Sequence, residues 1–194
     1  MLNFLIGMML GFSLAVPPGP MNALIAAESL RSPIHGTMVG AGAMTADAIL
    51  MTISLLLYQL VKPFVYYIYL AGGIIMIYLA YNVLMSKQIG SNNKAVTISY
   101  TKGIIMGITN PYQISWWVTA GLSFISIFGI ESVLGLFIAI IIWIIVFPII
   151  INLGSRYGGS KAYDVIRVTT AAAIVGFGLY FIINGLTQLH LISL

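Results

Sequence analysis

Long apolar runs fill this chain from one end to the other, separated by short segments in which glycine, proline and charged residues gather. A helix needs roughly 20 mainly apolar residues to cross the hydrocarbon core of a bilayer. Six runs are long enough, at residues 2–27, 37–61, 64–85, 103–128, 132–153 and 168–189. They are too long for the strands of a membrane β-barrel and do not alternate apolar with polar residues. The pattern predicts an all-α integral membrane protein with about six transmembrane helices.

Composition indicates that lipid is the main solvent of the chain. Of its 194 residues, 60% are hydrophobic and 6% are charged, and no polar segment is long enough to fold by itself. We therefore expect a single membrane domain over residues 1–194. The eight basic residues stand singly, without the basic patch that nucleic acid requires, so no nucleic-acid partner is expected. Cysteine is absent, which excludes disulfides and thiolate metal sites.

The basic residues are distributed unevenly among the connections between runs. Lys62 lies in the second connection, and the other seven lie in the first, third and fifth. These seven are Arg31, Lys87, Lys94, Lys102, Arg156, Lys161 and Arg167. Because Lys and Arg are retained on the cytoplasmic side during insertion, we expect these connections in the cytoplasm and both termini outside. Residues 1–3 carry no basic region, so no cleaved signal peptide is expected.

Two sequence patterns recur in the two halves of the chain. Gly-x-x-x-Gly opens the first run at Gly7 and the fourth run at Gly103, and proline follows in both. Tyr-x-x-x-Asn-x-Leu begins at Tyr78 in the third run and at Tyr180 in the sixth. Each half holds three spans, an odd number, so two inverted three-helix repeats are expected. The two halves and the cytoplasmic linker between them are expected at residues 2–86, 103–194 and 87–102, respectively.

Two of the runs contain residues that break a helix. Proline removes a backbone donor and clashes with the preceding turn, which frees carbonyl groups at a depth where lipid offers no partner. Freed backbone at such a depth is typical of a transporter cavity. A packing kink is the alternative, but the proline cluster in the first run removes too many bonds for a kink alone. We predict broken first and fourth helices and a substrate-binding site that includes Pro17, Pro18, Gly19, Pro20, Asn22, Asn110, Pro111 and Gln113.

Asp47 is the one acidic residue well inside a predicted span. It lies roughly eight to ten residues from the cytoplasmic end of its helix, close to the bilayer midplane at about 1.5 Å of rise per residue. The same count places Pro20 and Asn110 at the same depth. A carboxylate there is costly unless it is hydrated, paired or protonated. We assign Asp47 to substrate binding and to proton or ion coupling. The alternative is a protonated Asp that bonds only to a neighbouring helix.

Other polar and aromatic residues are assigned to packing or to the membrane interface. Glu28 is expected to form an ion pair with Arg31, three positions on. His35 is expected at the interface and is too isolated to bind a metal. Trp116 and Trp117 are expected to pack, since adjacent helical positions point about 100° apart. No metal site and no cofactor are predicted.

Taken together, these features resemble the LysE-type amino-acid exporter family, also called LysE/RhtB. The resemblance covers nearly the whole chain. It is carried by Pro17-Pro18-Gly19-Pro20, by Gly40 and Gly42 before Asp47, and by Gly103-x-x-x-Gly107 before Asn110-Pro111. It implies proton- or ion-linked export of amino acids or related small solutes. A basic residue commonly follows Asn-Pro in the family, whereas Tyr112 and Gln113 stand here, so the solute and the coupling ion are left open.

The predicted site favours a solute that carries both charges. Half-helices beginning at Met21 and Pro111 present positive N-termini that favour a carboxylate, while Asp47 favours an ammonium group. No nucleotide-binding loop is present, so a gradient and not ATP must drive transport. We expect a secondary carrier in the plasma membrane that exports amino acids or related small zwitterions.

Three other functions fit parts of the pattern. A divalent-metal exporter of related six-helix architecture should carry several acidic or histidine residues inside its spans. A membrane enzyme should place a nucleophile and base, metal ligands or an acidic pair at one depth. A structural subunit would leave the proline cluster unexplained. We expect no enzymatic activity. The solute and the lipid bilayer are the expected partners, and the oligomeric state is left open, with a homodimer as one arrangement.

Overall fold

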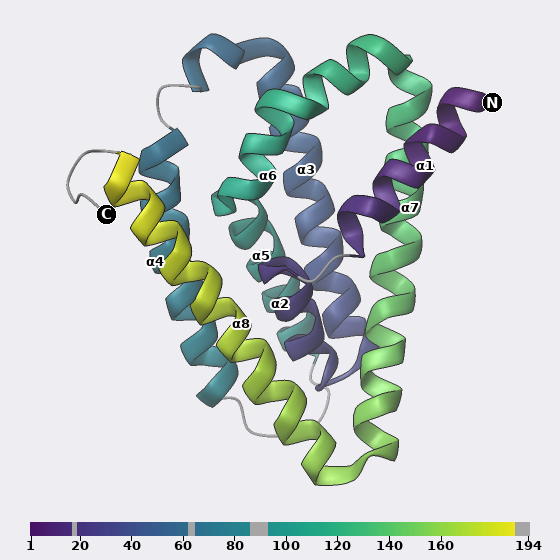
Figure 1. Ribbon diagram of the computed structural model, residues 1–194. Helices are drawn as coiled ribbons and strands as arrows, with labels where there is room; N and C mark the ends of the chain where they lie inside the picture. Colours follow the sequence, from purple (N-terminus) through teal and green to yellow (C-terminus); the bar gives the residue numbers. More distant parts are fainter. Residues whose placement is uncertain (17–18, 62–64, 86–92, 189–194) are drawn as a thin grey trace.

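The computed structural model describes residues 1–16, 19–61, 65–85 and 93–188, and throughout these ranges the regular secondary structure is helical. The elements are α1 (Leu2–Ala15), α2 (Pro20–Ser29), α3 (Pro33–Val61), α4 (Val65–Met85), α5 (Asn93–Thr109), α6 (Pro111–Trp116), the π-helix η2 (Trp117–Gly121), α7 (Leu122–Tyr157) and α8 (Gly159–Gln188). Figure 1 shows the long helices arranged around the short helix α2. The expected all-α membrane fold is confirmed.

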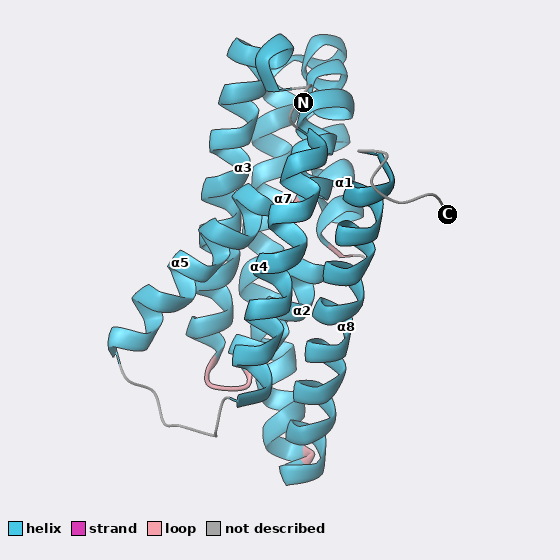
Figure 2. Ribbon diagram, turned by 90° about the vertical axis from the view of Figure 1, so that its left-hand side faces the viewer, coloured by secondary structure: helices cyan, strands magenta, loops and turns pink. Residues whose placement is uncertain are grey.

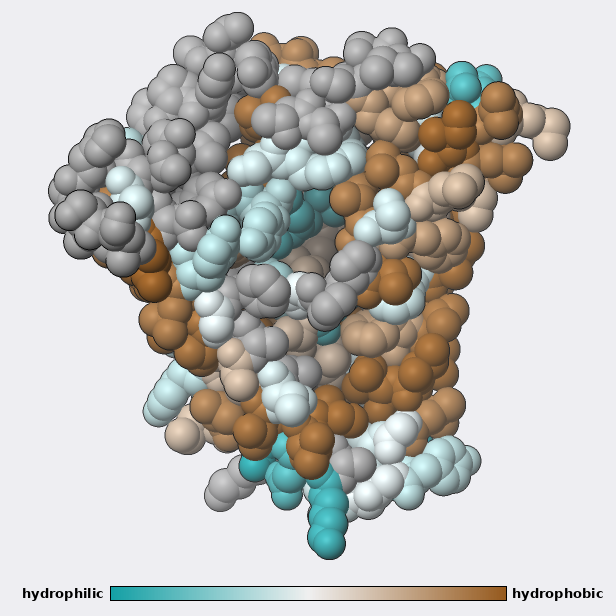
Figure 3. Space-filling view, viewed as in Figure 1, coloured by the Kyte–Doolittle hydropathy of each residue, from teal (hydrophilic) through white to brown (hydrophobic). Residues whose placement is uncertain are grey.

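Several helices are long and apolar enough to cross a membrane. Within the described ranges they are Pro33–Leu56, Phe128–Tyr157 and Gly159–Thr187. A fourth candidate is the pair Leu2–Ala15 and Pro20–Ser29, which is bent by 75° at its break. Large apolar side chains are exposed on the outside of these helices, and hydrophobic residues cover much of the face drawn in Figure 3. Lipid tails are the environment that such a surface matches.

The first predicted span is broken, as expected. α1 ends at Ala15 and α2 begins at Pro20, with Gly19 as its N-cap in an extended conformation. Proline is favoured at the first helical position because the amide it lacks would have no partner within the helix. Pro17 and Pro18 lie outside the described residues. α2 ends at Ser29, two residues beyond the predicted end of the span.

The fourth predicted span is broken as well. α5 ends at Thr109, Asn110 caps the next helix, and Pro111 opens α6. The π-helical turn η2 then leads into α7. Within α7, Gly129 has φ 70° and ψ −177°, a conformation that glycine adopts readily and other residues rarely do. This bend separates the fourth predicted span from the fifth.

The segment expected as a linker is largely helical. α5 begins at Asn93, so the predicted start of the fourth helix at 103 is wrong by ten residues. Figure 2 shows the first turns of α5 reaching outward from the bundle. Hydropathy detects only the apolar part of a helix, whereas a polar extension bonds its own backbone equally well and gives no such signal. Residues 87–92 lie outside the described ranges.

Glycine lets α1 lie directly against α7, and α5 directly against α3. A Cβ at Gly7 would overlap the carbonyl oxygen of Ser132, and one at Gly103 would overlap that of Val39. Small residues allow this close backbone approach between membrane helices. Together with α4 and α8, which run side by side in Figures 1 and 2, these are the most extensive helix pairs of the described chain.

The contacts of α1 with α7 are repeated by α5 with α3 at constant spacing. Gly7 and Gly103 stand 96 positions apart, and their partners Ser132 and Val39 stand 93 positions apart. The same two offsets relate two further pairs of contacts: Phe4 with Gly135 to Tyr100 with Gly42, and Gly11 with Ala139 to Gly107 with Ala46. Three matching contacts therefore define one register between the two halves.

Helix α2, which follows the first break, lies in the centre of the bundle. Seven consecutive residues of α2, from Ala23 to Ser29, are buried. The helix packs against α3, α7 and α8. Leu24 and Ile25 belong to a core cluster with Val39 of α3 and Phe181 of α8. The residues at the start of α2 are thereby held at a fixed place inside the protein.

Candidate functional site

A cavity of about 380 Å³ lies where the two helix breaks meet. Small-molecule sites commonly measure roughly 300–1,000 Å³. The first break contributes Gly19 and Pro20 to the lining, and the second contributes Asn110 and Gln113. The rest of the wall comes from α1, α2, α3, α6, η2 and α7. A hollow is visible on the face drawn in Figure 3.

Asp47 of α3 lines this cavity and is held by two donors from the opposite wall. Its Oδ1 accepts a hydrogen bond from Nε2 of Gln113 at 3.0 Å and another from Nε1 of Trp117 at 2.8 Å. Its second oxygen, Oδ2, accepts none from the described residues. The carboxyl group is therefore fixed in orientation while one oxygen stays available for a proton or a ligand.

The orientation of Gln113 is set by the second helix break. Asn110 caps α6 by accepting a hydrogen bond from the amide of Tyr112 at 3.1 Å. Its Nδ2 donates to Oε1 of Gln113 at 3.1 Å. This leaves the Gln113 amide nitrogen to donate to Asp47. The Asn-Pro break is thus connected to Asp47 through the side chains of Asn110 and Gln113.

Asn22 bridges the first helix break. Its Nδ2 donates to the carbonyl oxygen of Ala15, the last residue of α1, and its Oδ1 accepts from Nε1 of Trp143 at 3.1 Å. The first of these bonds satisfies a carbonyl at the end of a helix, where the intrahelical partner is lost. Trp143 of α7 also lines the cavity. Sequence reasoning missed it, because a tryptophan in an apolar run is more often part of a packed core.

Trp116 and Trp117 pack in a core cluster with Leu50 and Ile114, as predicted, and both also line the cavity. They lie at the junction of α6 with the π-helix η2. Their rings meet edge to face, with centroids 4.7 Å apart and planes at 87°. A single π-helical turn has no clear sequence signature, and such turns occur frequently at functional sites.

The structure brings together most of the residues assigned to the site from the sequence. Of the nine, six line the cavity: Gly19, Pro20, Asn22, Asp47, Asn110 and Gln113. Pro111 does not line it and is buried as the first residue of α6. Pro17 and Pro18 lie outside the described residues. Asp47 is the one charged residue among the described residues of the lining.

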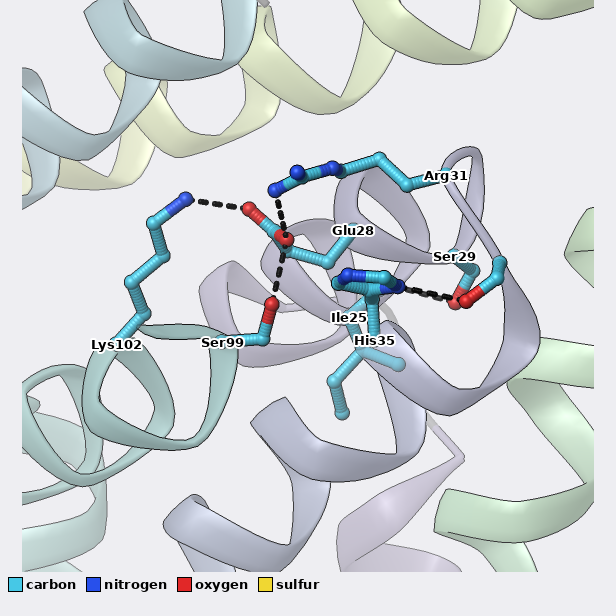
Figure 4. Close-up of polar contacts among 8 residues, drawn as sticks. Ile25, Glu28, Ser29, Arg31, His35, Ser99 and Lys102 are labelled. Atoms are coloured by element: carbon cyan, nitrogen blue, oxygen red, sulfur yellow. Dashed lines mark hydrogen bonds and ion pairs between the residues drawn. The ribbon is translucent and has the colours of Figure 1, made fainter. Parts of the chain in front are cut away.

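A second polar cluster lies between α2 and α5. Glu28, which is 5% exposed, pairs with Nζ of Lys102, accepts from Oγ of Ser99 at 2.8 Å and pairs with Arg31 at 3.4 Å (Figure 4). We call these four residues the Glu28 cluster. The expected pair of Glu28 with Arg31 is confirmed, and the acid is buried within the protein. Lys102 was missed as a partner because 74 positions separate it from Glu28.

His35 lies beside the Glu28 cluster (Figure 4) and is fully buried within the protein. α3 begins at Pro33, one turn before the predicted start at 37, which places His35 in a helical turn that packs inward. Its Nδ1 lies 2.6 Å from Oγ of Ser32. Its Nε2 has no hydrogen-bond partner in the described part of the chain.

Comparison with known proteins gives two matches that cover most of the chain. A family profile described as "LysE type translocator" matches residues 12–185, which include both helix breaks and Asp47. The curated protein "Putative amino acid efflux protein YcgF" of Bacillus subtilis (strain 168) is 25% identical over 207 aligned residues, covering 96% of this chain and 98% of that protein. No solved structure shows a significant match.

Proposed function

This chain belongs to the LysE type translocator family, and from that premise we propose that it exports amino acids or related small zwitterions as a gradient-driven secondary carrier. The observation that carries the proposal is Asp47, fixed by Gln113 and Trp117 in a cavity between two broken helices. The name of the Bacillus relative, which gives amino acid efflux as its role, supports the same solute class.

An amino acid offers two charges that match this cavity. Oδ2 of Asp47 takes the ammonium group, because it is the uncommitted oxygen of the one charged lining residue in the described chain. The carboxylate lies at the start of α2, where Gly19 provides no side chain to cap the first amides. The start of α6 is a poorer place for it, because Asn110 already bonds the Tyr112 amide.

The architecture that we propose has six spans in two inverted repeats. The spans are α1 with α2, then α3, α4, the chain from α5 to the Gly129 bend, the rest of α7, and α8. The matched glycine contacts of α1 with α7 and of α5 with α3 support the repeat, because one symmetry operation would produce both. Inverted repeats with broken helices at the midplane are common in secondary transporters.

We place the chain in the plasma membrane with both termini outside. The α2–α3 turn, the first turns of α5 and the α7–α8 turn gather at the lower end of Figure 1. These segments contain or adjoin the basic residues Arg31, Lys102 and Arg156. The positive-inside rule supports a cytoplasmic position for that end.

Transport by the purified protein tests this function. The protein is reconstituted in liposomes that are preloaded with a mixture of labelled amino acids, and efflux is followed with and without a proton gradient. We expect efflux of at least one amino acid that rises when the gradient is imposed. Absence of efflux for every amino acid, with protein correctly inserted, would overturn the proposal.

A further inference from the structure

We propose that the solute carries an uncharged, apolar side chain of about the size of leucine, methionine or phenylalanine. This inference rests on the proposed function and names its substrate class. The cavity wall is mainly apolar and aromatic, and it includes Trp116, Trp143, Met44, Ile140 and Ile144. Such a wall favours a solute whose own side chain gains from leaving water.

The charge of the cavity wall selects against basic and acidic amino acids. Asp47 is the one charged group of the described lining, and it is committed to the ammonium group of the solute. A lysine or arginine side chain would need a second acid, but Glu28 is not part of the lining and is paired with Lys102 and Arg31. An acidic side chain would meet no cation among the described lining residues and would be repelled by Asp47. An unpaired charge away from water is costly in either case.

The aromatic part of the wall is held in place. Trp143 stacks on Phe147 with centroids 4.9 Å apart and planes at 11°, and its indole nitrogen donates to Asn22. Trp116 meets Trp117 edge to face. Met44 adds a flexible side chain that adapts to different apolar shapes. The wall therefore combines fixed rings with one adaptable contact and favours bulky apolar side chains over small ones by roughly 10- to 100-fold.

A transport panel with the purified protein in liposomes tests this class. Leucine, methionine and phenylalanine are compared with alanine, lysine, arginine, aspartate and glutamate. We expect the three bulky apolar solutes to be transported at least about tenfold more efficiently than any charged one. Lysine or glutamate transported as well as leucine would overturn the substrate class while leaving amino acid export intact. If no amino acid is transported, the proposed function itself fails.

One variant tests whether the apolar wall makes the selection. Ile140→Asn keeps a similar size but places an amide in the wall. The ratio of leucine to alanine transport should fall by about tenfold, because alanine has too little side chain to gain from the wall. The ratio separates selectivity from misfolding, since a damaged protein loses both activities together. An unchanged ratio would contradict the inference.

From a separate observation, we infer that the Glu28 cluster closes the cavity toward the end of the protein that holds Arg31, Lys102 and Arg156. Glu28 lies eight residues after Pro20, about 12 Å along α2. Lys102 lies eight residues before Asn110, about 12 Å along α5. The ion pair therefore joins α2 to α5 about two helical turns away from the breaks that line the cavity. Figure 4 shows that Glu28 accepts from Ser99 and Lys102 of α5 and from Arg31 of the turn after α2.

The position of α1 that is equivalent to Lys102 carries no cation. With the offset of 96 that relates α1 to α5, the residue equivalent to Lys102 is Ile6. An apolar side chain there cannot form the same ion pair. The Lys102 contact is thus not repeated at the equivalent position of α1, whereas helix packing is matched in both halves. A buried pair of this kind is stable when complete and unfavourable when one partner is removed.

Chemical labelling tests this closure, because the chain has no cysteine of its own. Met44→Cys places a single thiol in the cavity. A membrane-impermeant maleimide is added from either side of proteoliposomes. The maleimide is first added from the side of the Glu28 cluster. We expect labelling to be about tenfold faster when Met44→Cys is combined with Glu28→Gln or with Lys102→Met than in Met44→Cys alone. The double variant should label no faster than the single ones, because each change removes the same bond.

Asp164→Asn is the matched control for the Glu28 cluster. Asp164 pairs with Arg167 near the start of α8, but its side chain is 59% exposed, so the change should not affect labelling. Equal labelling of all variants would overturn the inference. An equal rise from both sides would also overturn it, because that result indicates general loosening of the bundle and not an opening at one end.

Discussion

Trp117 donates its indole N–H to Oδ1 of Asp47 at 2.8 Å, from a π-helical turn that lies 70 positions further along the chain. Gln113 donates to the same oxygen. Both donors belong to the segment that follows the Asn110 break, so the geometry of that break determines how the acid is held. The second helix break and Asp47 therefore form one structural unit.

Replacement of Asp47 tests its proposed role in binding and coupling. Asp47→Asn keeps the size of the side chain but removes its charge and its exchangeable proton. We expect normal insertion and a loss of gradient-driven efflux of about 100-fold or more, since removing one partner of a buried charge pair is costly. Asp47→Glu should retain weak proton-driven efflux. The measurement is efflux of preloaded leucine at matched protein amounts, with Asp164→Asn as the control. Undiminished efflux by Asp47→Asn would remove this residue from the mechanism.

Trp117→Phe tests the hydrogen bond to Asp47 while keeping an aromatic ring in the cavity. A hydrogen bond to a charged group contributes about 1.5–3 kcal/mol, so we expect leucine transport efficiency to fall by about 10- to 100-fold. In an Asp47→Asn background the same change should have little further effect, because the charged acceptor is already gone. Additive losses in the double variant would show that Trp117 acts independently of Asp47.

The glycine contacts predict matched losses of stability in the two halves. Gly7→Ala and Gly103→Ala would each drive a methyl group into a backbone carbonyl of the facing helix. We expect each to destabilise the protein by about 1–3 kcal/mol. Gly154→Ala is the control, because a Cβ there meets nothing within 4 Å and alanine favours the helix. Thermal unfolding in detergent is the measurement, and a stable Gly103→Ala variant would contradict the proposed symmetry.

Topology reporters test the orientation in the membrane. Fusions after Lys94 and within the α7–α8 turn should report the cytoplasm, and fusions at either terminus should report the outside. The expectation follows from the seven basic residues in the first, third and fifth connections. A cytoplasmic N-terminus would reverse the proposed orientation and would place the Glu28 cluster on the external side of the cavity.

Features that depend on local chemistry could be predicted from the sequence. Proline at 17, 18, 20 and 111 and the isolated Asp47 each conflict with an ordinary membrane helix, and counting residues placed them at one depth. Six of the nine predicted site residues do line one cavity. The binding role of these residues stays a prediction that the experiments above address.

Features that depend on the rotation of a helix could not be predicted in the same way. Trp117 and Gln113, four positions apart, reach Asp47 because their common helix face turns toward α3, and Trp143 reaches Asn22 from another helix. Lys102 could be paired with Glu28 only once α5 was known to lie beside α2. Sequence periodicity describes each helix separately, so contacts between distant helices leave no trace in it.

The glycine contacts also limit how the protein can move. α1 packs closely against α7, α3 packs closely against α5, and α4 lies along α8. Each pair joins a helix before residue 86 to a helix after residue 92. Each half therefore contributes one helix to every pair. Neither half can rotate against the other as a rigid body without separating all three pairs. We therefore expect these pairs to stay together as a fixed frame during transport. We expect movement instead in the segment of α6 with η2, which lies inside this frame and begins at the Asn110 break.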